Sequence, residues 1–168
     1  MTDLSLSKNQ LSGFVPSELG YMTQLQSLYL NNNNLFGKIP SELGQLSQLA
    51  ELSLYSNQLS GNIPSELSNL LELTKLFFYN NKLTGSIPSK LGNCIKMVEI
   101  DMGNNQLRGI VPMELGNLMR LTTLHLYKNY LTGKIPTELG RLSEMTGLDF
   151  SNNQLSQIIP SELGKLTQ

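Results

Sequence analysis

Residues 25–46 read LQSLYLNNNNLFGKIPSELGQL, and this stretch decides the fold. Its leucines, asparagine, glycines and proline make the frame L-x-x-L-x-L-x-x-N-x-L-x-G-x-I-P-x-x-L-G-x-L. The frame recurs along the chain without insertion or deletion, as one asparagine of it shows: Asn9, Asn33, Asn57, Asn81, Asn105, Asn129 and Asn153. Successive members lie 24 residues apart, so the 168 residues hold seven copies. A fixed period of this length indicates a repeat architecture.

Each copy divides into an extended half and a turn half. The x-x-L-x-L-x-x portion alternates as a strand with one buried face does, so we expect Leu28 and Leu30 to point inward and Tyr29 outward. The asparagine that follows can bond backbone groups of its own turn and of adjacent coils. The next glycine permits a tight turn. The P-S-E-L-G segment predicts one or two helical turns, with proline in the first.

This pattern resembles the plant-type leucine-rich repeat family over the whole chain, and the I-P-x-x-L-G segment distinguishes that subclass. The resemblance implies an α/β solenoid, a right-handed horseshoe with a parallel β-sheet on its concave face and short 3-10 or helical turns on its convex side. Ser68 replaces the glycine of one L-G pair, and Gln157 replaces the last L-x-G glycine, where we expect a less regular backbone. Residues 1–168 should form a single array, which we expect to be a fragment lacking both caps.

Composition and motifs narrow the classes of function. The net charge is −1 and the 12 basic residues are scattered, which disfavours nucleic acid as a partner. No apolar stretch approaches the roughly 20 residues of a membrane span. Cys94 is the only cysteine and stands at a frame leucine, which predicts a core side chain. No phosphate-binding or kinase motif is present, so we expect no enzyme activity, no cofactor and no metal; any kinase activity would reside in other sequence.

Aromatic side chains gather at the outward positions of the expected strands. Equivalent positions of successive strands lie about 4.8 Å apart, so seven strands give a surface roughly 34 Å long. Tyr29, Tyr55, Phe77 and Tyr79 should cluster across the second to fourth copies. Tyrosine is over-represented at interfaces, which favours a binding surface, although aromatic residues also suit strands by propensity alone.

A polar group follows in the later copies. Parallel stacking would place His125, the only histidine, between Asp101 and Asp149, each about 5 Å away. Three side chains stacked on a flat sheet converge poorly on a metal ion, and they lack a paired nucleophile. We therefore interpret them, with Tyr127, as a polar patch on the recognition surface.

The sequence predicts a non-catalytic module that binds a protein or peptide on its concave face, through Tyr29, Tyr55, Phe77, Tyr79, Asp101, His125, Tyr127 and Asp149. The resemblance implies receptor-like proteins and receptor-like kinases, in which such an array senses a ligand outside the cell. An intracellular scaffold and a hydrolase-inhibitor-like protein remain as alternatives. The resemblance favours an extracellular or membrane-attached location, whereas the lone cysteine, the lack of N-x-[ST] sequons and the lack of a signal peptide favour an intracellular one.

Overall fold

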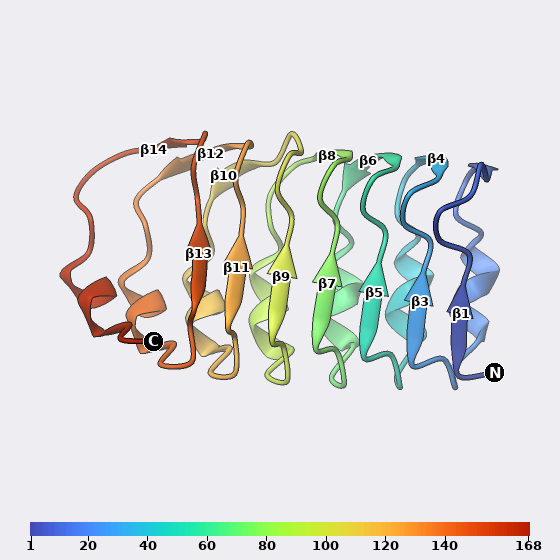
Figure 1. The fold of residues 1–168 in the computed structure, drawn as a ribbon, viewed down its shortest axis with the longest axis horizontal. Helices are drawn as coiled ribbons and strands as arrows, with labels where there is room; N and C mark the ends of the chain where they lie inside the picture. Colours follow the sequence, from blue (N-terminus) through green and yellow to red (C-terminus); the bar gives the residue numbers. More distant parts are fainter.

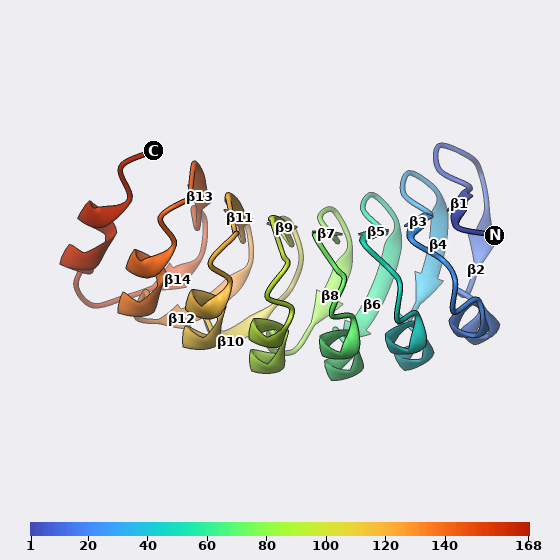
Figure 2. The ribbon, with the colours of Figure 1, turned by 90° about the horizontal axis from the view of Figure 1, so that it is seen from below.

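The computed structural model describes residues 1–168 as one curved stack of coils (Figure 1). Leu28 pairs with Leu52 and Leu52 with Leu76, so equivalent residues lie side by side. Figure 2 shows the main strands on the inner side of the arc and the helices on the outer side, which confirms the predicted solenoid of seven repeats. The main sheet is parallel and in chain order: β1 (Asp3–Ser5), β3 (Ser27–Tyr29), β5 (Glu51–Ser53), β7 (Lys75–Phe77), β9 (Glu99–Asp101), β11 (Thr123–His125) and β13 (Gly147–Asp149).

A 3-10 helix of five residues closes each coil on the convex side. A proline directly precedes every helix in an extended conformation, as at Pro40 with φ −64° and ψ 134°. The ring fixes φ and the proline lacks an N–H, so it fits the residue before the helix rather than the first turn that the sequence suggested. The helices are η1 (Ser17–Tyr21), η2 (Ser41–Gln45), η3 (Ser65–Asn69), η4 (Ser89–Asn93), η5 (Met113–Asn117), η6 (Thr137–Arg141) and η7 (Ser161–Lys165).

The glycine of the L-G pair lets neighbouring helices approach each other. A β-carbon on Gly44 of η2 would overlap the backbone carbonyl of Glu66 in the next coil. The same holds for Gly92 of η4 against Glu114. The missing side chain therefore sets the spacing of coils on the convex side, a role that sequence reasoning did not assign.

A second set of short parallel strands, not anticipated from the sequence, lies on the flank between the main sheet and the helices (Figures 1 and 2). The frame glycines in this region have positive φ, for example 82° at Gly37. In the last coil Gln157 replaces the glycine and still adopts a φ of 72°, a conformation in which a side chain is strained. The strands form two sheets, β2 (Ser12–Gly13), β4 (Asn34–Gly37), β6 (Gln58–Asn62) and β8 (Lys82–Thr84), then β10 (Arg108–Ile110), β12 (Tyr130–Gly133) and β14 (Gln154–Leu155).

The frame asparagines join consecutive coils through their side chains. The Asn105 Nδ2 group donates to the carbonyls of Phe78 at 3.0 Å, Met102 at 3.1 Å and Gly103 at 3.2 Å. Its Oδ1 atom accepts the N–H of Leu83 at 3.0 Å. One side chain thus ties its own turn to the preceding coil, as the sequence predicted. Equivalent bonds are made by Asn33, Asn57, Asn81, Asn129 and Asn153.

The apolar frame residues form one continuous core of 36 buried side chains between the sheets and the helices. Cys94 is fully buried, in agreement with its place at a frame leucine. The end coils are less covered, since frame residues that are buried in the middle coils are exposed there: Leu6 and Leu11 in the first coil and Ile159 in the last. That the array is a fragment lacking caps stays a prediction.

No helix of the structure is long and apolar enough to cross a membrane.

The residue before each frame asparagine has a left-handed backbone, and in three coils it is neither asparagine nor glycine. Lys128 has φ 51°, where most side chains are strained and asparagine is better tolerated. We expect Lys128→Asn to raise the free energy of unfolding by about 0.5–1 kcal/mol in urea titrations. Lys134→Asn is the control, because Lys134 is exposed on the flank and its φ is not positive. This substitution should change the free energy of unfolding little. Equal effects of the two substitutions would contradict the argument.

Candidate functional site

The eight predicted binding residues lie in two columns on the concave side. Five of them end main-sheet strands: Tyr29, Phe77, Asp101, His125 and Asp149. The other three, Tyr55, Tyr79 and Tyr127, stand two residues beyond a strand. All eight side chains are half-buried. Each column therefore offers partial contact area to a partner while it packs against its own neighbours.

The aromatic residues form a pair rather than the four-membered cluster that the sequence suggested. The rings of Tyr55 and Tyr79 stack with centroids 4.3 Å apart and planes 9° from parallel. Burial and the contact with Tyr55 raise the pKa of Tyr79, so this phenol stays a neutral donor. Tyr29 lies apart, because its hydroxyl donates to Glu51 Oε2 at 2.5 Å. Phe77 stacks on no other ring.

A row of alternating charges, missed in the sequence, begins the main strands beside these columns. Lys75 Nζ lies 3.9 Å from Glu51 Oε1 and 3.5 Å from Glu99 Oε1. The three residues are partners in the parallel register, which brings them together. The hydrogen bond from Tyr29 to Glu51 extends the row by one coil and raises the pKa of Tyr29. The row lies along the edge of the aromatic surface and adds charged groups of both signs to the concave side.

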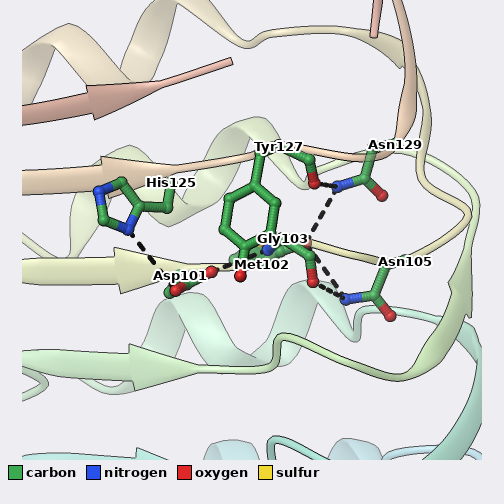
Figure 3. Close-up of polar contacts among 7 residues, drawn as sticks. All are labelled: Asp101, Met102, Gly103, Asn105, His125, Tyr127 and Asn129. Atoms are coloured by element: carbon green, nitrogen blue, oxygen red, sulfur yellow. Dashed lines mark hydrogen bonds and ion pairs between the residues drawn. The ribbon is translucent and has the colours of Figure 1, made fainter. Parts of the chain in front are cut away.

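The register places His125 between Asp101 and Asp149, as predicted, but the histidine contacts only one of them. Its Nδ1 atom lies 3.6 Å from Asp101 Oδ2 (Figure 3). Each aspartate also accepts a backbone N–H two residues on, Asp101 from Gly103 at 2.9 Å and Asp149 from Ser151 at 2.9 Å. Both carboxylates therefore help to close the turn after the strand, a structural role that the sequence reading did not consider.

The two carboxyl groups differ in their electrostatic setting. Burial raises the pKa of Asp101, and the hydrogen bond from Gly103 and the nearby His125 oppose that shift. Hydrogen bonds from Ser151 lower the pKa of Asp149. Asp149 thus carries a firmly ionised carboxylate at neutral pH, and Asp101 holds its charge in a less favourable environment.

Tyr127 lies flat against the preceding coil because that coil has no side chain at the same position. A β-carbon on Gly103 would overlap the tyrosine ring (Figure 3). Burial and the charges of Asp101 and Asp149 raise the pKa of Tyr127. The ring centroid of His125 is 6.3 Å away with the planes at 64°. Asp101, His125 and Tyr127 thus lie together at coils five and six. The columns of these residues followed from the sequence, but the contact between Tyr127 and Gly103 did not.

The chemistry available on this face is recognition by aromatic contact, hydrogen bonding and charge. No group of three or more histidine, cysteine, aspartate or glutamate side chains is placed to hold a metal ion. The stacked tyrosines offer flat apolar area, and the polar group offers a carboxylate, an imidazole and a phenol.

Comparison with known sequences identifies the repeat. The sequence model of the Leucine Rich Repeat family matches seven segments, 1–22, 24–46, 48–70, 72–94, 96–118, 120–142 and 145–166. The family is a repeat family and indicates no catalytic activity. A search of curated protein sequences gave no match.

Solved structures of plant receptors resemble the chain closely. The plant peptide hormone receptor RGFR1 in complex with RGF2 superposes with a TM-score of 0.96 at 40% identity, over 97% of this chain and 26% of that one. A TDR receptor gives 0.94 at 38% identity, over 96% and 28%. The Arabidopsis receptor kinase HAESA, in complex with the peptide hormone IDA and the co-receptor SERK1, gives 0.79 at 32%, over 92% and 30%.

The chain spans between about a quarter and a third of the length of these three structures. The seven family matches and the identities of 32–40% to plant receptors agree with the I-P-x-x-L-G frame. The chain is therefore a member of the leucine-rich repeat family, of the plant type.

Proposed function

We propose that this array is the peptide-sensing part of a receptor-like protein, and that an extended peptide binds along its concave face. The observation that carries the proposal is the parallel stack of Tyr55 and Tyr79 at the middle of that face. Such rings supply large, rigid contact area at low entropic cost. The similar receptors include one in complex with RGF2 and one with the peptide hormone IDA, which supports a peptide as the ligand here.

The ligand would lie across the strands, along the axis of the solenoid. Its apolar part would contact the tyrosine stack, with Phe77 and Tyr29 beside it. Its polar part would reach coils five to seven, where the half-buried Asp149 offers an ionised carboxylate and His125 and Tyr127 offer hydrogen-bonding groups. The array itself performs no chemistry in this proposal, and signalling would pass to other parts of the receptor.

The decisive test is to remove the tyrosine stack. Peptides that bind the wild-type array are first selected from a synthetic library of secreted plant peptides by fluorescence polarisation. Tyr55→Ala combined with Tyr79→Ala is expected to weaken their binding at least about 30-fold, because buried tyrosines at an interface centre commonly act as hot spots. Dissociation constants of wild type and double variant for the same peptide give the answer.

Tyr21→Ala is the matched control, because Tyr21 is exposed at the end of the convex helix η1 and should not contact the peptide. Thermal melts of both variants check that the coil remains folded. Binding that is undiminished in the double variant would place the peptide site on another face.

A further inference from the structure

Three exposed side chains on the flank of coils five and six, those of Arg108, Met113 and Tyr130, depart from what the other repeats carry there. Met113 stands at a position that is serine or threonine in every other coil: Ser17, Ser41, Ser65, Ser89, Thr137 and Ser161. Tyr130 stands at a position that is otherwise polar: Gln10, Asn34, Gln58, Lys82, Gln106 and Gln154. Arg108 stands at a position that is uncharged in every other coil: Ser12, Phe36, Ser60, Thr84, Thr132 and Ser156. Ile110 lies two residues on, at a position that is also apolar in the first and last coils, Phe14 and Ile158. The fold does not require these residues, because other coils form without them.

The structure brings the three departures together with Ile110. The guanidinium carbon of Arg108 lies 4.8 Å from the centre of the Tyr130 ring. The Ile110 side chain rests on the backbone of Gly133, with Cγ2 only 3.1 Å from where a β-carbon would stand. Ile110 and Met113 line one pocket of about 560 Å³, which Val111 and Pro136 complete on the apolar side. β10 and β12, which carry Arg108, Ile110 and Tyr130, are paired in the flank sheet.

These side chains are open to solvent in spite of their apolar character. Ile110 is 63% exposed, Met113 56% and Tyr130 42%. Tyrosine, methionine and arginine are the residue types enriched in protein interfaces, and contiguous apolar area on a surface marks interaction sites. The flank sheet is separate from the concave sheet, so a partner here would leave the concave face free.

The basic side chains on this flank indicate the charge of the partner. Arg108 forms no ion pair, and its contact with Tyr130 uses the ring face, so the guanidinium N–H groups remain available to a carboxylate. Lys134, at the rim of the pocket, also forms no ion pair. The pocket lining also holds two carboxylates, Glu114 and Glu138, which lie on the helices η5 and η6, whereas Arg108 lies beside the pocket on the flank strand β10.

We propose that this flank is a second docking surface, for a protein segment that carries an aliphatic or aromatic side chain next to a carboxylate. The apolar side chain enters the pocket between Ile110 and Met113. The carboxylate pairs with the guanidinium of Arg108, which Tyr130 holds in place. This partner is distinct from the peptide of the concave face.

A counter-selected peptide display tests the proposal on the whole chain. Random twelve-residue peptides on phage are selected on the wild-type protein and depleted on a variant with Arg108→Thr, Met113→Ser and Tyr130→Gln. Each replacement occurs at the same position of another coil, so the variant should fold, and its melt checks this. The surviving peptides are expected to pair an acidic residue with leucine, isoleucine or phenylalanine.

The selected peptides are then synthesised, and their dissociation constants are measured for the wild-type protein and for single variants. Arg108→Gln alone should weaken binding at least tenfold, whereas Arg120→Gln, an exposed arginine elsewhere, should leave it unchanged. The Tyr55→Ala and Tyr79→Ala variant should bind these peptides normally, so failure of the concave site and failure of this one are distinguishable. Survivors without an acidic residue, an unaffected Arg108→Gln, or no survivors at all would overturn the proposal. Sedimentation that shows a dimer abolished by the triple variant would overturn it too, because the occupant would then be a second copy.

Discussion

Asn105→Ala is expected to lower the free energy of unfolding by about 2–4 kcal/mol, since buried polar groups left without partners cost about 1–3 kcal/mol each. The side chain is buried and bonds to four backbone groups in two coils. Alanine would leave the Leu83 N–H without a partner at a place where water has little access, and it would remove one of the two side-chain donors of the Phe78 carbonyl, which keeps Asn81. Urea titration followed by circular dichroism measures the change.

Asn9→Ala is the matched control for this effect. Asn9 occupies the same frame position in the first coil, but it is exposed and bonds only the carbonyls of Leu6 and Ser7. Because these groups can turn to water instead, the control should cost less than about 1 kcal/mol. If Asn9→Ala and Asn105→Ala had the same cost, the energy would not come from the bonds between coils.

Gly44→Ala is expected to destabilise the array by about 1–3 kcal/mol, the usual cost of inserting a methyl group into a packed site. The new β-carbon would overlap the carbonyl of Glu66, a backbone atom that cannot turn aside. The helices η2 and η3 would have to move apart. Ser68 shows that a coil boundary can accommodate a side chain at this position, so the array should remain folded.

Gly164→Ala is the control, because it makes the same change at the same helical position of the last coil. Nothing lies within 4 Å of a β-carbon there. Alanine should therefore leave stability unchanged or raise it by up to about 1 kcal/mol through the unfolded chain. Thermal melts of both variants would refute the packing argument if Gly44→Ala were as harmless as Gly164→Ala.

The sequence was enough to predict the solenoid, because the frame residues act through period and burial alone. Asn57 and Cys94 could be placed in the structure from their position in the 24-residue unit. The flank sheet escaped prediction, since its short strands carry no alternating pattern of their own. The role of Gly44 also escaped prediction, because the atoms that a side chain there would overlap belong to Glu66 in the next coil, and the sequence does not show their distance.

The candidate site was predicted less completely, for a physical reason. Columns follow from register, and register follows from the repeat, so the neighbours of His125 were known in advance. Side-chain direction does not follow from register. Asp149 accepts a hydrogen bond from the backbone of its own turn, and Tyr29 donates one to Glu51 of the next coil, so neither side chain contacts the neighbour that its column suggested.

The fit of Tyr127 against Gly103 bears on how the chain reaches its fold. Because every coil offers its neighbour nearly the same leucines and asparagines, a growing stack could accept a coil out of turn during folding, the misassembly typical of repeat proteins. Skipping the fifth coil would place His125 beside Phe77 and not beside Asp101, and it would remove the bare backbone of Gly103 against which Tyr127 lies. Such contacts are specific to one pair of coils and are not supplied by the consensus frame. They therefore favour the native order of coils over an assembly that skips one.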